Sequence, residues 1–387
     1  MTGAAPKHYP CLMINPNDTF NTISALQSQS SEKNDGDARF KHELLKISAD
    51  VHAASYSVCV QVENAAPKPP RKMSPKAFVQ FVGKELKQAR HVVVCYEAGP
   101  TGFWVARKLI EMGAHCVVVR PCRLDAYGRR VRNDRTDVIA LAERLDRYVA
   151  GSPNALAAVA IPSAEQELTR AQSRQCDFLR KQRQAIAAHG RGQMLLWGVR
   201  ARGQWWKKKG WEELCAQLTV EQQELLQPLI ETLKQFDERL KQGDRKLEAE
   251  GEKRERPKGA GARTLEQIDR EICDWNRFTN RKQPAAYAGL CGGVDATGGR
   301  HADLPITKAG NRRLRSMLVE MAWRLVRWQP DCPLIQRWKH VLLDPKAHGR
   351  GRKKAIVAVA RRLIVDLWRW RTGRVTAEQL GWKMMDV

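Results

Sequence analysis

The chain has 387 residues, which is more than a single hydrophobic core usually spans, so we expect two or three domains. Its 67 lysines and arginines outnumber its 42 aspartates and glutamates and leave a formal net charge of +25. An excess of this size favours a polyanionic partner, because each neutralised phosphate releases condensed counterions. The apolar stretches are far shorter than the ~20 residues of a membrane span, and the first residues lack a signal-peptide pattern. We therefore expect a cytoplasmic protein that binds no membrane.

The first part of the chain predicts a tail followed by an α/β domain. Residues 1–42 are rich in Ser, Asn, Gln, Asp and Pro and carry few periodic apolar positions, which predicts a disordered tail. Within residues 43–155, strand-like apolar segments alternate with helix-like segments, and this predicts an α/β domain with a partly parallel sheet. We expect strands at residues 45–51, 55–62, 91–97 and 115–119, and helices at residues 75–88 and after Gly102.

Residues 156–255 predict a helical arm. Apolar residues recur in its second half at steps of three, four or seven, with charged residues between them: Leu225, Leu229, Leu233, Phe236, Leu240 and Leu247. This spacing is typical of a coiled coil or a helix hairpin. Because a single chain would leave such a seam exposed, we expect a homodimer that forms through the arms.

Residues 256–387 predict a second, mostly helical domain that is strongly basic. One face of the last long helix is apolar, and arginines lie off that stripe. Any single basic run is compatible with a solvated helix face, whereas several runs in one domain favour contacts with phosphates. The cations that we expect to bind nucleic acid here are Lys308, Arg312, Arg313, Arg315, Lys353 and Lys354.

Four carboxylates are candidates for a metal site. Asp50 and Glu97 each end a predicted strand, while Asp134 and Asp137 lie three residues apart at the start of a helix and so share one face. Each has an ordinary alternative: a turn residue, a strand-end charge or a helix N-cap. Together they match the needs of two Mg²⁺ ions about 4 Å apart, which require oxygen ligands from several elements.

These acids lie in three segments, residues 47–50 (ISAD), 95–102 (CYEAGPTG) and 133–137 (NDRTD). The segments resemble the acidic motifs of the DEDD insertion-sequence transposases. These transposases form insertion-sequence family one-ten, the bridge-RNA-guided recombinases, to which the Piv invertase is related. The resemblance extends from about Leu45 to Trp370. It implies a RuvC-like N-terminal domain with a ribonuclease-H-like fold, in which the four acids bind Mg²⁺.

The C-terminal part of the resemblance lies in residues 281–290 (RKQPAAYAGL), 295–300 (DATGGR) and 306–312 (ITKAGNR). Family members usually carry Ser-Gly where this chain has Thr297-Gly298, and that serine attacks DNA to form a covalent phosphoprotein. The resemblance makes Thr297 the candidate nucleophile, although a threonine hydroxyl is more hindered and has a stiffer χ1. Gly298 and Gly299 allow close approach to a phosphate, so we expect them and Arg300 to bind nucleic acid. A plain glycine turn is the alternative.

The leading hypothesis is a transposase that cuts and rejoins DNA. The resemblance alone implies guidance by a structured bridge RNA, and it implies that acids and hydroxyl meet across protomers. We expect the homodimer to assemble into a tetramer on DNA. Two alternatives stay open: a RuvC-like metal-dependent nuclease that uses water, and a non-catalytic nucleic-acid-binding protein derived from a transposase.

Overall fold

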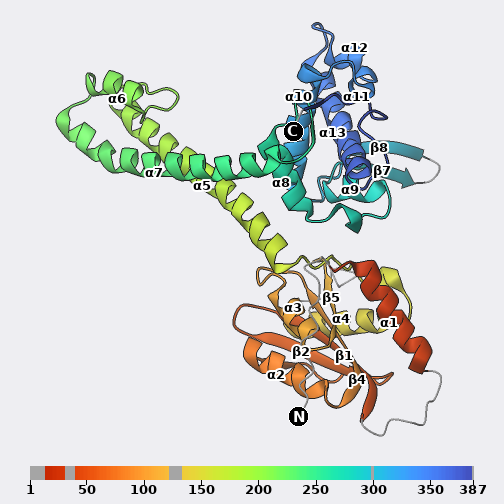
Figure 1. Ribbon diagram of the computed structural model, residues 1–387. Coiled ribbons are helices and arrows are strands. Elements are labelled where there is room, and N and C mark those ends of the chain that lie inside the picture. The colour runs from red at the N-terminus through yellow and green to blue at the C-terminus, as the bar shows by residue number, and fades with distance from the viewer. Residues whose placement is uncertain (1–13, 31–39, 122–132, 298–299, 386–387) are drawn as a thin grey trace. The chain divides into compact units, whose positions relative to one another are not determined.

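The computed structural model describes residues 14–30, 40–121, 133–297 and 300–385 (Figure 1). The chain divides into two units, of which the first ends at Glu167 and the second begins at Leu168. No helix within the described ranges combines the length and the apolar character that crossing a membrane requires.

The first unit is built on a five-stranded sheet with the order β3-β2-β1-β4-β5. Strands β1 and β2 pair antiparallel, as do β2 and β3, whereas β4 runs parallel to both β1 and β5. The α/β class and the partly parallel sheet are therefore confirmed. Strand β3 was not predicted, because three residues are too few to display an alternating pattern. The strand bounds are β1 His42–Val51, β2 Tyr56–Val62, β3 Arg71–Met73, β4 Ala89–Glu97 and β5 His115–Val119.

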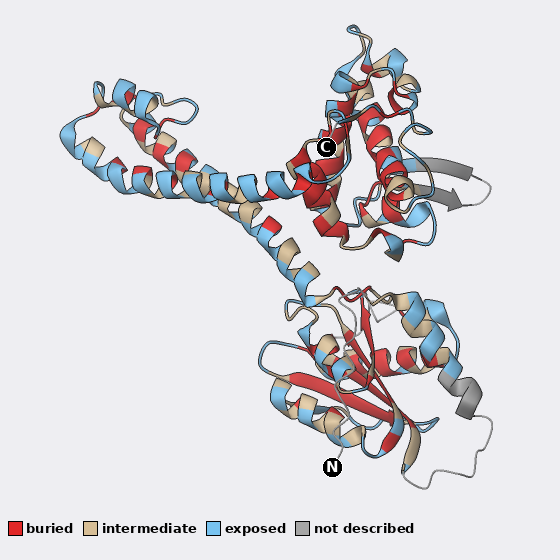
Figure 2. Cartoon of the chain, in the orientation of Figure 1, coloured by how far each residue is buried: buried red, intermediate tan, exposed pale blue. Residues whose placement is uncertain are grey.

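Helices cover both faces of this sheet, and the strands are buried between them (Figure 2). Successive residues of a strand point to opposite faces. Val94 of β4 accordingly packs in a core with residues of α2 (Pro75–Glu85) and α3 (Trp104–Glu111). Its neighbour Val93 packs with residues of α4 (Asp134–Val149) and α1 (Pro16–Ser30). A short 3₁₀ helix, Pro153–Ala155, follows α4.

Helix α1 corrects the prediction of a disordered tail over residues 1–42. Ile23 is fully buried, and the ring of Phe20 packs edge-on against Tyr148 with the centroids 5.0 Å apart. Ile14 exchanges two backbone hydrogen bonds with Ile161, at 2.9 and 3.0 Å. A few well-placed apolar residues therefore order this segment, although its average composition is polar. The parts of the predicted tail at residues 1–13 and 31–39 lie outside the described residues.

The second unit contains a helix hairpin formed by α7 (Val220–Glu252) and by α5 (Ala164–Leu196) from Leu168 onward, with the short helix α6 (Lys208–Cys215) near its turn. Ion pairs join the two long helices in antiparallel order, Arg180 to Asp244 at 2.9 Å and Arg183 to Asp237 at 2.6 Å.

The homodimer was predicted because the apolar seam of α7 would be exposed in a single chain. In this hairpin, α5 covers that seam within the same chain. Leu233, Leu240 and Leu247 are buried within one chain, whereas Leu225, which was also expected in the seam, is 59% exposed. The reason is that α5 supplies the covering helix. The homodimer stays a prediction without that support.

The rest of the second unit is a mostly helical domain around a core of α8, α10 and α13 residues. A β-hairpin of β7 and β8 was not predicted, and neither was the short β6–β9 pair. The helix bounds are α8 Ala262–Ile272, α9 Lys282–Tyr287, α10 Arg312–Trp328, α11 Pro333–Gln336, α12 Lys339–Leu342 and α13 Gly349–Arg371, with a 3₁₀ helix at Trp275–Arg277. The strand bounds are β6 Arg256–Pro257, β7 Gly292–Thr297, β8 Arg300–Ile306 and β9 Met384–Met385.

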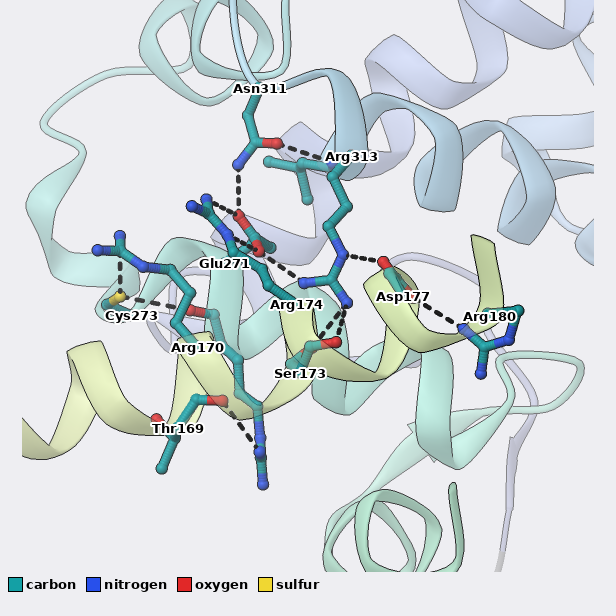
Figure 3. A network of polar contacts seen from close by, with 12 residues as sticks. Thr169, Arg170, Ser173, Arg174, Asp177, Arg180, Glu271, Cys273, Asn311 and Arg313 are labelled. Carbon is teal, nitrogen blue, oxygen red and sulfur yellow. Dashed lines mark hydrogen bonds and ion pairs between the residues drawn. The ribbon is translucent and has the colours of Figure 1, made fainter. Parts of the chain in front are cut away.

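A buried carboxylate, that of Glu271 at the end of α8, joins the arm to this domain (Figure 3). Its side chain is 0% exposed and accepts hydrogen bonds from Arg174 of α5 at 2.9 and 2.8 Å. Arg313 of α10 donates to it at 2.6 Å, and the Asn311 amide donates at 2.7 Å. Burial alone would raise the pKa of Glu271, but the hydrogen bonds from Arg174 and Asn311, the charge of Arg174 and the bond from Arg313 lower that pKa to about 2.

Replacement of this carboxylate should destabilise the second unit strongly. Glu271→Ala leaves two guanidinium groups without their buried partner, and we expect a loss on the order of 3 kcal/mol in the free energy of unfolding. Urea unfolding followed by tryptophan fluorescence measures this loss, because every tryptophan except Trp104 lies in the second unit. Glu224→Ala, at an exposed position of α7, is the control and should change little.

The Glu271→Ala variant also tests the lowered pKa of Glu271. A carboxyl with a folded pKa of about 2 and an ordinary value of 4.5 stabilises the fold above pH 4.5. That contribution disappears as the pH falls through this window. The difference in the free energy of unfolding between the parent and Glu271→Ala should therefore be smaller at about pH 2 than at pH 4.5. An equal difference at both ends would contradict the network as described.

Candidate functional site

One face of β1 carries a polar stripe formed by Lys46, Ser48 and Asp50, which are two residues apart and so point the same way. Lys46 is 1% exposed and forms an ion pair with Asp146 of α4. The Ser48 hydroxyl donates to the carbonyl of Val138, also in α4, at 2.8 Å. Two contacts along the helix set its rotation and register on the strand. The first turn of α4 consequently lies near Asp50.

An open hollow of about 310 Å³ lies where these elements end. Asp50 and Glu97 belong to neighbouring parallel strands, with Ala49 paired to Tyr96, so both carboxylates lie at the same edge of the sheet. Asp134 and Asp137 line the same hollow from the first turn of α4. The structure thus brings all four predicted acids around one space.

Three groups in this hollow are close enough to share a metal ion. Ligand atoms of Asp50, His52 and Asp134 all lie within 4.8 Å of one another. The His52 Nε2 atom is 3.2 Å from the Asp50 carboxylate, and the Lys72 ammonium is 3.8 Å from Asp134. Glu97 lines the hollow but is not part of this closest group.

His52 was not among the predicted site residues. The signal in the sequence is its position two residues after Asp50, which places both side chains on one side of an extended chain. The signal is weak, because His52 lies just beyond the end of β1 and is exposed.

The ordinary role considered for Asp134, a helix N-cap, belongs to its neighbour. The Asn133 side chain accepts a hydrogen bond from the backbone N–H of Arg135 at 2.9 Å and caps α4. The Asp134 carboxylate, which is about half exposed (49%), is therefore not needed for capping. Carboxylates at the first turn of a helix also benefit from the positive end of its dipole.

In the second unit, two of the predicted motif segments meet at the base of the β7–β8 hairpin. The backbone N–H of Asn311 donates to Tyr287 at 2.8 Å, and that of Thr307 donates to Cys291 at 2.9 Å. Gly310 has a φ of 154°, and a Cβ there would lie 2.5 Å from the Gly289 nitrogen. Only glycine permits this approach. Residues 281–290 and 306–312 thus form one support for the hairpin.

Thr297 is the last residue of β7, and its partner in the register is Arg300, the first residue of β8. The backbone of the candidate nucleophile is therefore at the end of the hairpin, away from its base. The side chains of Thr297 and Arg300 are not described, and Gly298 and Gly299 lie outside the described residues.

The cations predicted to bind nucleic acid fall into two groups. Arg313 is 17% exposed and bonds to Asp177, Glu271 and Ser173, so its contacts are internal. Arg315 donates to the carbonyls of Ala288 and Lys308 at 2.9 and 3.2 Å and holds the loop before α10. The exposed group consists of Lys308, Arg312, Lys353 and Lys354.

Comparison with known proteins agrees with these motifs. Residues 255–334 match the model of a family described as "Transposase IS116/IS110/IS902 family". The chain is 30% identical over 316 residues to y4qE of Sinorhizobium fredii, covering 72% of this chain and 75% of the relative, and 29% identical to y4rJ of the same organism (74% and 78%). Both are named as candidate transposases. It is 26% identical to the transposase for insertion sequence element IS1111A of Coxiella burnetii (73% and 78%).

Removal of one acid should weaken metal binding at the sheet edge. Asp134→Asn keeps the shape of the side chain but removes its charge, so we expect Mn²⁺, used as a spectroscopic probe for Mg²⁺, to bind at least ~10-fold more weakly. Electron paramagnetic resonance of free Mn²⁺ measures this affinity. Glu143→Gln, at an exposed position of the same helix, is the matched control. Equal affinity in the two variants would contradict a metal site in this hollow.

Proposed function

The chain belongs to the IS116/IS110/IS902 family of transposases, and we propose that it recombines DNA through a metal-assisted, covalent hydroxyl–phosphate intermediate. The observation that carries this proposal is the convergence of Asp50, Glu97, Asp134 and Asp137 on one hollow. Its walls come from two parallel strand ends and a helix, and ligands commonly bind at such an edge of an α/β sheet.

The residues of this hollow fit Mg²⁺. Carboxylate oxygens are the ligands that Mg²⁺ prefers, and the open side leaves room for water and a phosphate. We propose Asp50, Glu97, Asp134 and Asp137 as the ligands, for two ions. Bound metal would offset the negative charge that develops on the phosphodiester during strand cleavage. The mixed sheet with acids at its edge also supports the proposed RuvC-like assignment of this unit.

We propose Thr297 as the nucleophile of the second unit. Its hydroxyl oxygen forms a bond to the phosphorus atom of DNA, and one P–O ester bond of the strand breaks. The hydroxyl proton leaves Thr297, and the leaving DNA oxygen takes up a proton to become a strand-end hydroxyl. A second strand-end hydroxyl then attacks the phosphorus and releases Thr297, so the number of phosphodiester bonds is conserved. Arg300 is the nearest cation along the chain to offset the transient charge.

DNA is the partner that this reaction requires, and the exposed cations support it. Lys308 and Arg312 follow β8, and Lys353 and Lys354 lie in the first part of α13. A guide RNA is a further proposal that rests on the resemblance to the bridge-RNA-guided recombinases. The net charge of +25 is compatible with both polyanions and does not distinguish them.

Loss of an acid should abolish cleavage without loss of binding. We expect Glu97→Gln and Asp134→Asn to lower the rate of strand cleavage in Mg²⁺ by more than ~10²-fold, because several kcal/mol of transition-state stabilisation is removed. Affinity for DNA, measured in EDTA, should stay close to that of the parent. Glu143→Gln should cleave normally. Undiminished cleavage by both variants would remove the hollow as the site of chemistry.

The Thr297 hydroxyl is tested by trapping the covalent product. Thr297→Ala should leave no protein–DNA adduct on a denaturing gel, and Thr297→Ser should raise the amount of recombination, because a primary hydroxyl is less hindered. Free cleaved ends without an adduct in the parent protein would instead favour a resolvase-like nuclease that uses water. Binding without cleavage in all three proteins would favour the non-catalytic alternative.

A further inference from the structure

A second hollow, of about 420 Å³, lies between helices α9 and α13 of the second unit. Four cations line it: Arg281 and Lys282 at the start of α9, and Arg361 and Arg362 on α13. All four side chains are exposed, and no acidic residue is among the described residues that line the hollow. Its lining residues all belong to the second unit, whereas those of the carboxylate hollow all belong to the first.

The shape of this hollow comes from small residues on two facing helices. Ala285 and Ala286 of α9 and Ala358 of α13 line it between the cations. On α13 the lining residues are spaced at three, four and seven positions from Ala358, which places them on one helix face. The alanines are small, whereas the four cations that also line the hollow have long, exposed side chains. A hollow with this lining suits the phosphates of a nucleic-acid backbone.

Most of the positive charge here has no carboxylate partner among the described residues. Arg362 has a partner, because its Nε atom donates to the buried carboxylate of Asp366 at 3.0 Å. For Arg281, Lys282 and Arg361, no ion pair with a carboxylate is found in the part of the chain that the structure describes. This arrangement differs from that of Arg313, whose guanidinium is surrounded by carboxylate and hydroxyl oxygens. An uncompensated group of cations around a concave surface attracts a polyanion.

The hollow lies at the root of the β7–β8 hairpin. Cys291, which lines it, directly precedes β7, the strand that ends at Thr297. A strand bound in the hollow would therefore be held next to the base of the element that carries the candidate nucleophile. Arg361 and Arg362 belong to the basic runs that favoured phosphate contacts in the sequence, whereas Arg281 and Lys282 were not predicted to bind nucleic acid.

We propose that this α9–α13 hollow binds the phosphodiester backbone of DNA and directs the bound strand along the β7–β8 hairpin. Guanidinium groups suit this task, because their planar donors match phosphate oxygens in pairs. The choice of DNA as the ligand rests on the proposed function. The inference that the hollow binds a phosphodiester backbone does not, because it follows from the cations that line the hollow. RNA has the same backbone chemistry and forms the second arm of the test.

The test measures binding in EDTA, where strand cleavage does not contribute. Arg281→Gln/Arg361→Gln should weaken binding of a labelled DNA duplex at least ~10-fold, and it should reduce the slope of log affinity against log salt by about 2, since each lost phosphate contact contributes about 0.9. The matched control is Lys234→Gln/Lys241→Gln, which removes two exposed lysines from α7. Equal losses in both double variants, or none in the first, would overturn the proposal.

Cys291 gives a local readout that does not depend on affinity alone. Its thiol is partly exposed, so bound DNA should slow its alkylation by iodoacetamide several-fold, as mapped by mass spectrometry. Cys215 of α6, also partly exposed, should react at an unchanged rate. Protection of Cys291 by structured RNA but not by DNA would assign the hollow to RNA and overturn the choice of DNA. Protection by neither would overturn the site itself, while cleavage by the parent in Mg²⁺ would leave the proposed function standing.

Discussion

Lys46 lies in the middle of a β-strand with almost no access to solvent, and a buried ammonium group is costly unless it is paired. Its partner, Asp146, is in α4, so the helix must pack where the two charges meet. Ser48, the next residue on the same strand face, binds the backbone of α4 one turn after the helix begins. Asp50 completes the row. The location of the carboxylate hollow follows from this pairing, because it brings the first turn of α4 to the ends of β1 and β4.

Much of the first unit could be predicted from the sequence, since its signals are local. Apolar runs marked β1, β4 and β5, and the ends of parallel strands necessarily meet at one sheet edge, which brought Asp50 and Glu97 together. The helix spacing of Asp134 and Asp137 placed both acids on one face. His52 was missed, because its side of the chain is not defined by any strand pattern. Helix α1 was missed because two of its described residues, Phe20 and Ile23, join the core of this unit, and two apolar contacts do not change the polar average composition of the segment.

The second unit was harder to predict, because its features depend on contacts between distant segments. The β7–β8 hairpin is supported by a loop and a helix end that meet around Gly310, and β7 begins with two glycines, which weaken a strand pattern. The arginines illustrate the same limit. Nothing in the sequence distinguishes Arg313 from Arg361. In the structure, Arg313 forms an ion pair with the buried carboxylate of Glu271, whereas Arg361 lines an open hollow. A net charge of +25 counts both alike. Only the fold separates cations that stabilise the protein from those available to a ligand.

The network around Glu271 has a consequence for the order in which the protein is made. Helix α5 is synthesised well before α7 and α8, yet its arginines depend on carboxylates from those later helices: Arg174 on Glu271, Arg180 on Asp244 and Arg183 on Asp237. Domains generally fold as units as the chain is synthesised from its N-terminus. During synthesis, which takes place close to the ribosome's own RNA, Arg183 and Arg180 therefore lack these partners until residues 237 and 244 have been added, and Arg174 lacks its partner until residue 271 has been added. When α5 packs against α7 and α8, these arginines form ion pairs with their carboxylates and no longer bind other anions.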